Sequence, residues 1–186
     1  MGQYYDVILE QNGKTFYFNM QIKGSNEHNP SKLMEHSWWE NPFCLALSSK
    51  IHNKPSRIIW CGDYWEEEDF DEFEDKEKII QKAKKLNENG VAKEIEESDF
   101  SLDGKYLVNH DMKVYVDLCE YHKQNERDGW CIFPISLLTA VGNGRGGGDY
   151  EGVNKEDVGI WSWNLLSIDD KAPENFEKVE LEFYED

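Results

Sequence analysis

The sequence predicts an α+β fold, a mainly antiparallel sheet built from hairpins with one or two helices packed against it. Three observations predict this class: two strand-like segments flank Asn12-Gly13, two more flank Asp111-Met112, and a helix start is recognisable at Asn41-Pro42. With 186 residues and 25 aromatic side chains, the chain is long enough to bury a core. We therefore expect one domain over residues 1–186, with an acidic helical insertion at about 65–90.

The first hairpin is predicted at the N-terminal end. Residues 5–10 and 15–20 are rich in Val, Ile, Tyr and Phe, and Asn12-Gly13 lies between them. Asn and Gly both tolerate the positive φ that a type I′ turn requires, so this pair is a strong hairpin signal.

A helix over residues 42–51 should follow, because Asn41 can cap it and Pro42 suits the first helical position. The apolar run at 57–61 then fits a buried strand that ends at Gly62-Asp63-Tyr64.

The second half of the chain supplies more strands. A second hairpin is predicted from 106–110 and 113–118, and 135–141 fits either a short helix or a strand. Further strands are expected at 130–134, at 159–168 with Trp161 and Trp163 on one face, and at 177–184 with Val179, Leu181 and Phe183 turned inward.

Charge is the most distinctive property of the composition. Lys and Arg total 20 and Asp and Glu total 38, a formal net charge of −18. Such a balance argues against direct nucleic-acid binding, which needs a basic footprint, and leaves room for a basic partner. From residue 66 to 75, eight of ten positions are acidic, and this acidic run is the predicted partner-binding site: Glu66, Glu67, Glu68, Asp69, Asp71, Glu72, Glu74 and Asp75. The alternative is a solvated helix face.

The expected location is the cytoplasm of a host cell, without membrane contact. No basic start followed by an apolar run opens the sequence, and no apolar stretch approaches the length of a membrane span. The four cysteines are expected to be free thiols.

A glycine-rich segment at 142–149 formally contains the dinucleotide-binding spacing Gly142-x-Gly144-x-x-Gly147. Because Asp149-Tyr150 follows in place of an apolar helix, we reject that interpretation and predict a loop in which Arg145 can anchor a carboxylate.

A metal site is a further hypothesis. His36, Asp63 and His110 each lie at or just after an apolar run, where strand ends can converge. Imidazole and carboxylate ligands suit zinc, so one structural zinc ion is the cofactor considered.

Several segments together resemble a family of small, largely uncharacterised proteins of phages, prophages and plasmids. The resemblance is carried by residues 1–5, 33–38, 57–64, 106–110, 142–150 and 158–161. It implies a mobile-element origin, and this chain departs from the family by its acidic run.

Small acidic proteins from such sources are similar in kind to anti-CRISPR proteins. The functional hypothesis is therefore a phage-derived inhibitor whose acidic surface occupies the basic nucleic-acid channel of a host defence nuclease, such as one of the Cas9 type. The alternative is a metal-dependent or nucleotide-processing enzyme that uses His36, Asp63, His110 and the glycine-rich loop.

Overall fold

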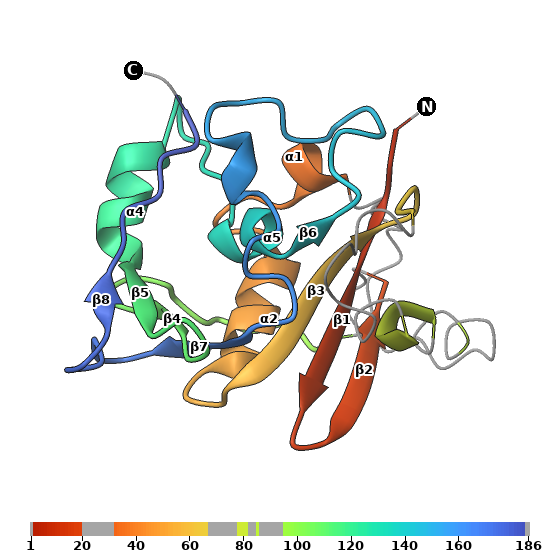
Figure 1. Cartoon of the computed structure of the whole chain (residues 1–186). Helices are drawn as coiled ribbons and strands as arrows, with labels where there is room; N and C mark the ends of the chain where they lie inside the picture. Colours follow the sequence, from red (N-terminus) through yellow and green to blue (C-terminus); the bar gives the residue numbers. More distant parts are fainter. Residues whose placement is uncertain (1, 20–31, 67–77, 82–84, 86–94, 185–186) are drawn as a thin grey trace.

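The computed structural model describes residues 2–19, 32–66, 78–81, 85 and 95–184. Their strands form one eight-stranded sheet in the order β2-β1-β3-β7-β4-β5-β8, with β6 pairing beside β3 (Figure 1). Neighbours are antiparallel except for the parallel pairs β3–β6 and β5–β8. The predicted α+β class is confirmed. The strands are β1 (Tyr5–Gln11), β2 (Lys14–Phe18), β3 (Ser56–Gly62), β4 (Tyr106–Asn109), β5 (Val114–Asp117), β6 (Ala140–Val141), β7 (Leu165–Asp169) and β8 (Glu177–Lys178). The helices are α1 (Leu33–His36), α2 (Pro42–Ile51), α4 (Leu118–Asn125), α5 (Pro134–Leu138) and the short 3-10 helix η2 (Lys155–Asp157).

The N-terminal hairpin forms as predicted. Gln11 pairs with Lys14, and Asn12 and Gly13 between them have φ of 53° and 71°. Positive φ at both central residues is the signature of the type I′ turn, whose twist matches that of the flanking strands.

Helix α2 has the predicted bounds and cap. The Asn41 side chain accepts hydrogen bonds from the backbone N–H groups of Phe43 and Cys44, at 2.8 and 3.4 Å. The helix packs on one face of the sheet, where the Phe43 ring meets the Trp60 ring edge-on with centroids 5.9 Å apart.

Strand β3 is buried on both faces, which explains its continuous apolar run. Ile58 and Trp60 belong to the main core with α2, whereas Ile59 and Cys61 belong to a second cluster on the opposite face. Ile80, from the helical residues 78–81, is fully buried in that second cluster. Residues 79 and 80 therefore pack on the sheet face opposite α2.

Two of the expected strands are not formed as predicted. Trp130 and Ile132, in the expected strand at 130–134, make only isolated bridges, and Pro134 already begins α5. Residues 135–141, expected as either a short helix or a strand, contain the rest of α5 and the short strand β6. Residues 159–164 turn, because Gly159 and Trp163 have φ of 81° and 65°, and only the following residues form β7.

The same turn places Trp161 and Trp163 in different clusters, so the prediction that they share a face was wrong. In the C-terminal segment only Glu177–Lys178 pairs as a strand, yet Leu181 and Phe183 point into the core as predicted.

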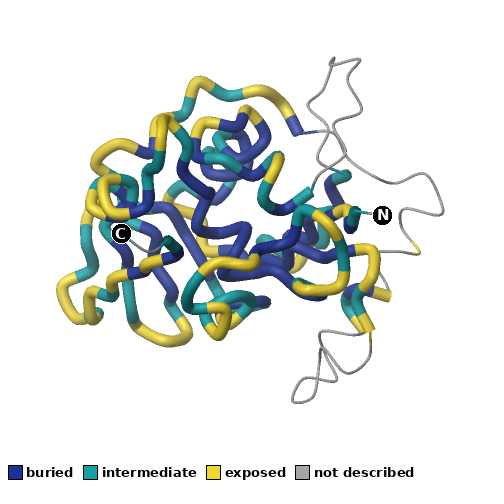
Figure 2. The backbone as a smooth tube through the Cα atoms, turned by 90° about the horizontal axis from the view of Figure 1, so that it is seen from above, coloured by how far each residue is buried: buried dark blue, intermediate teal, exposed yellow. Residues whose placement is uncertain are grey.

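Burial follows this layered arrangement. Figure 2 shows the buried residues gathered in the middle of the described chain and the exposed residues mainly on its outer turns. Of the helices in the described ranges, none has the length and apolar character required to traverse a bilayer.

Candidate functional site

Three distant segments meet at one end of β1. Gln3 and Tyr4 precede β1, Asp63 and Tyr64 follow the last residue of β3, Gly62, and the glycine-rich loop, residues 142–149, follows β6. The Asp63 carboxylate accepts a hydrogen bond from the Tyr4 backbone N–H at 3.0 Å, and the Asp63 N–H donates to the Tyr4 carbonyl at 2.8 Å. The Gln3 N–H donates to the Gly147 carbonyl at 3.3 Å, which attaches the loop to the same segment.

The glycine-rich loop wraps around the carboxylate of Asp149, which is 7% exposed. The Asp149 Oδ2 atom accepts hydrogen bonds from three successive backbone N–H groups, those of Gly144, Arg145 and Gly146, at 2.8, 3.0 and 2.9 Å. Successive amides that converge on one anion form the arrangement called a nest. The loop therefore folds around its own anion.

Two side chains from the N-terminal segment complete this site. Gln3 Nε2 lies 2.9 Å from Oδ2 and 3.1 Å from Oδ1 of Asp149, and the Tyr5 hydroxyl donates to Oδ1 at 3.1 Å. Burial and then the neighbouring Asp149 carboxylate raise the pKa of Tyr5 well above its usual value. Tyr5 thus remains a neutral hydrogen-bond donor.

The loop can approach Gln3 only because glycine occupies position 146. A Cβ atom there would lie 2.4 Å from the Gln3 Cβ and 2.5 Å from the Gln3 backbone nitrogen. Real Cβ contacts are never this short, so any side chain at this position would push the two segments apart.

This geometry accounts for the loop without a bound cofactor. In a dinucleotide site the loop amides face the ligand's pyrophosphate. Here the amides of residues 144–146 point at Asp149. They hold the fold together.

The acidic run begins beside this loop. Glu66 Oε2 lies 2.8 Å from Arg145 Nη1, so Arg145 contacts a carboxylate as the sequence suggested. The other seven predicted partner-binding residues lie outside the described residues: Glu67, Glu68, Asp69, Asp71, Glu72, Glu74 and Asp75.

The described residues on either side of the run share one anchor. Trp65 and Ile79 both pack against the second hydrophobic cluster, in which Ile80 is fully buried. The described residues that flank the acidic run therefore lie against the same face of the sheet.

Two exposed aromatic rings, Tyr4 and Tyr64, lie close to the start of the acidic run. Tyr4 is 44% and Tyr64 is 37% exposed, and the hydrogen bonds between Tyr4 and Asp63 hold the two segments together. Large exposed aromatic side chains are typical anchors of protein interfaces.

The three residues of the zinc hypothesis each make a separate contact. His36 Nδ1 accepts a hydrogen bond from the Lys32 N–H at 3.1 Å, Asp63 binds the Tyr4 N–H, and His110 Nε2 lies 2.7 Å from the Ser167 hydroxyl. Within the described ranges, no three His, Cys, Asp or Glu side chains form a group that could hold a metal ion.

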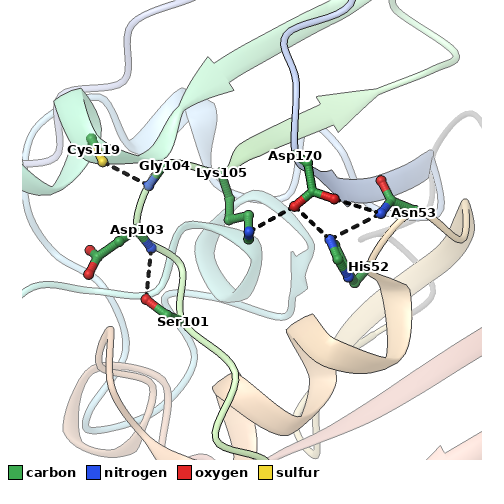
Figure 3. Close-up of polar contacts among 8 residues, drawn as sticks. All are labelled: His52, Asn53, Ser101, Asp103, Gly104, Lys105, Cys119 and Asp170. Atoms are coloured by element: carbon green, nitrogen blue, oxygen red, sulfur yellow. Dashed lines mark hydrogen bonds and ion pairs between the residues drawn. The ribbon is translucent and has the colours of Figure 1, made fainter.

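A second polar cluster lies away from the loop. Figure 3 shows His52, Asn53 and Lys105 converging on Asp170, at 3.0, 3.0 and 2.8 Å. These residues follow α2, precede β4 and follow β7, so the cluster connects three elements. The hydrogen bonds from Lys105, Asn53 and His52 lower the pKa of Asp170 well below its usual value. Every oxygen of this carboxylate is engaged, and the cluster acts as a clasp.

Comparison of the chain with models of protein families, with curated proteins and with solved structures finds no significant match. The site therefore has to be interpreted from its own geometry. Sequence reasoning missed Gln3 and Asp149, although an acid directly after a run of glycines was a usable signal for an amide nest.

Proposed function

We propose that the protein is a binding protein that inhibits a host nucleic-acid-targeting nuclease, of the kind blocked by anti-CRISPR proteins, by placing its acidic run in a basic nucleic-acid channel. The net charge of −18 supports a basic partner, because a strong field of one sign accelerates association with the opposite charge.

The observation that carries this proposal is the common anchor of the acidic run. Trp65 before it and Ile79 after it pack on one hydrophobic cluster, and Glu66 is ion-paired to the glycine-rich loop. The described residues that flank the acidic run, Trp65 and Ile79, are thereby attached to the same cluster. Charges concentrated in one region attract a basic channel more effectively than the same charges dispersed over the surface.

The glycine-rich loop supports a binding role over the enzymatic alternative. Its amides and its buried carboxylate satisfy one another, and Gln3 and Tyr5 complete the arrangement. The loop that these groups stabilise carries Arg145, the ion-pair partner of Glu66 at the start of the acidic run.

Tyr4 and Tyr64 extend the proposed interface. Buried aromatic anchors provide affinity, while surrounding charges govern the rate of association. The exposed rings at the base of the run are suited to the first role and the acids to the second.

The test uses a purified Cas9-type nuclease, without and with its guide RNA. The wild-type protein should bind the guide-free nuclease and block target cleavage, and a preloaded guide should weaken binding because it occupies the channel. No binding in either state would contradict the proposal for this class of nuclease.

A pair of variants then tests where the charge acts. One variant replaces four acids of the run by Gln, and its matched control replaces the exposed Glu174, Glu177, Glu180 and Glu182 on the C-terminal segment. Both changes remove four negative charges. The first should lower the association rate about tenfold at low salt and flatten its salt dependence, and the control should change it much less. Equal effects would show that only total charge matters.

A second pair tests the aromatic anchors. Replacing Tyr4 and Tyr64 by Ser should accelerate dissociation with little change in salt dependence. The control makes the same replacement at two other exposed apolar residues, Met112 and Ile160, which are 53% and 45% exposed. Unchanged dissociation in the tyrosine variant would remove these rings from the interface.

Turnover assays on nucleotides, with and without chelator, and elemental analysis of the purified protein address the alternative. Nucleotide turnover that stops on metal removal would favour the enzyme over the inhibitor.

A further inference from the structure

Asparagine followed by glycine occurs at residues 12–13, 89–90 and 143–144 of the chain. In this dipeptide an asparagine side chain reacts most readily with its own backbone, because glycine has no side chain to obstruct the attack. The first and third pairs lie within the described residues, and the second does not. The fold gives the two described pairs opposite surroundings, and these surroundings decide where the reaction can occur.

The reaction is deamidation, and its only co-reactant is water. The backbone nitrogen of the glycine attacks Cγ of the asparagine, so that a new N–Cγ bond forms and the Cγ–Nδ2 bond breaks. Ammonia leaves with the proton of the glycine N–H, and a cyclic succinimide remains. Water then opens the ring and gives aspartate or isoaspartate. The net change converts an amide and water into a carboxyl group and ammonia.

In the Asn12-Gly13 pair, both groups that must meet are accessible. The two residues are exposed at the tip of the N-terminal hairpin. Among the described residues, neither the Asn12 amide nor the Gly13 N–H has a hydrogen-bond partner. Apart from its chain neighbours, no described residue lies within 4 Å of the position that a Cβ atom would take at Gly13. The Asn12 side chain can therefore rotate toward the glycine nitrogen without losing a contact to the described residues.

In the Asn143-Gly144 pair of the glycine-rich loop, both groups are engaged. Asn143 Oδ1 accepts a hydrogen bond from the Tyr150 N–H at 2.8 Å, and Asn143 Nδ2 donates to the Tyr150 carbonyl at 3.2 Å. The Gly144 N–H donates to the buried Asp149 carboxylate at 2.8 Å. The attack would have to break these bonds, one of which is made to a charged group. The Asp149 nest therefore protects the asparagine of its own loop.

We propose that Asn12 is a site of spontaneous deamidation, and that the fold directs the reaction to Asn12 and away from Asn143. Gln11 pairs with Lys14 across the type I′ turn that Asn12 and Gly13 form. An isoaspartate lengthens the backbone of this turn by one carbon atom and adds a negative charge. Because the turn sets the register of β1 with β2, the modification destabilises the end of the hairpin.

Peptide mapping by mass spectrometry of the full-length protein tests the site. The protein is incubated at mildly alkaline pH, where the glycine amide loses its proton more readily, both in its native state and in concentrated urea. In the native protein Asn12 should convert at least about tenfold faster than Asn143, a factor that one hydrogen bond to a charged group can provide. In urea the two should convert at similar rates, because the contacts of Asn143 and Gly144 with Tyr150 and Asp149 are lost. Equal rates in the native protein, or an Asn12 that converts only in urea, would overturn the proposal.

Asn12→Gly is the matched variant, because Gly-Gly also fits a type I′ turn and has no amide to lose. After the same native incubation, wild-type protein with isoaspartate at position 12 should unfold at a lower urea concentration than before. The Asn12→Gly protein should keep its unfolding midpoint. The same loss of stability in both proteins would locate the damage elsewhere in the chain and refute the effect on the hairpin.

Discussion

Replacing Asp149 by Asn isolates the contribution of the buried carboxylate. In the wild-type protein the carboxylate accepts hydrogen bonds from three backbone amides, from Gln3 and from Tyr5. If the Asn oxygen retains the three amides, its NH2 group must face the Gln3 NH2 group. The Gln3 side chain cannot rotate to relieve this conflict without breaking its bonds to the Gly142 carbonyl and the Tyr64 N–H.

The cost follows from these contacts. One charge-assisted hydrogen bond is lost, worth about 1.5–3 kcal/mol, and a buried donor is left unpaired, which costs about 1–3 kcal/mol. Weaker bonds to the three amides add to this, so the free energy of unfolding should fall by about 3–6 kcal/mol. That is a large part of the roughly 5–15 kcal/mol that stabilises a typical domain.

The assay is urea unfolding followed by tryptophan fluorescence and circular dichroism. Asp103→Asn is the control, because Asp103 is exposed and its carboxylate makes no hydrogen bond among the described residues. The control should stay within about 0.5 kcal/mol of wild type. A loss below about 1 kcal/mol for Asp149→Asn would refute the nest as a stabilising element.

Three further variants test other parts of the fold. Gly146→Ala should cost about 3 kcal/mol in urea unfolding because its Cβ meets the Gln3 backbone, whereas Gly104→Ala, with open space and a φ of 65°, should cost about 1 kcal/mol; equal losses would refute the close contact. Ile80→Ala should cost about 2–4 kcal/mol by the same measurement, and a change near zero would mean that residues 78–81 add nothing to the core. For Asp170→Asn the prediction concerns pH: the folded pKa lies below the unfolded value of about 3.9, so the carboxylate stabilises the protein above that pH and the benefit is lost as the pH falls toward the folded pKa. Wild type should therefore exceed the variant in unfolding free energy at pH 7 and approach it in acid, and a gap that does not depend on pH would contradict the clasp.

Local signals in the sequence predicted the elements that depend on local chemistry. Asn12-Gly13 and Asn41-Pro42 act through φ preferences and a side-chain cap, and both operate within a few residues. The 159–168 segment failed as a continuous strand because its apolar pattern carries no mark of the positive φ at Trp163.

The candidate site was less accessible from the sequence because its contacts are long-range. Gln3 lies 146 positions from Asp149, and no periodic pattern joins two such residues. The sequence indicated that Arg145 would contact a carboxylate, but it did not indicate which one. The partner is Glu66, which the direction of β3 brings close to the glycine-rich loop. Charge concentration was visible in the sequence, and the common anchor of the acidic run required the packing of Trp65 and Ile79.

The pairing of Gln3 with Asp149 bears on how a ribosome-bound chain matures. Synthesis has to pass residue 149 and release it from the exit tunnel before Gln3 can find its acceptor. Until then, among the described strands, the first two residues of β1 pair only with β3. The contact between Gln3 and Asp149 therefore forms late in biogenesis. In stalled, shorter polypeptides the N-terminal segment that contains Gln3 will stay accessible to proteases.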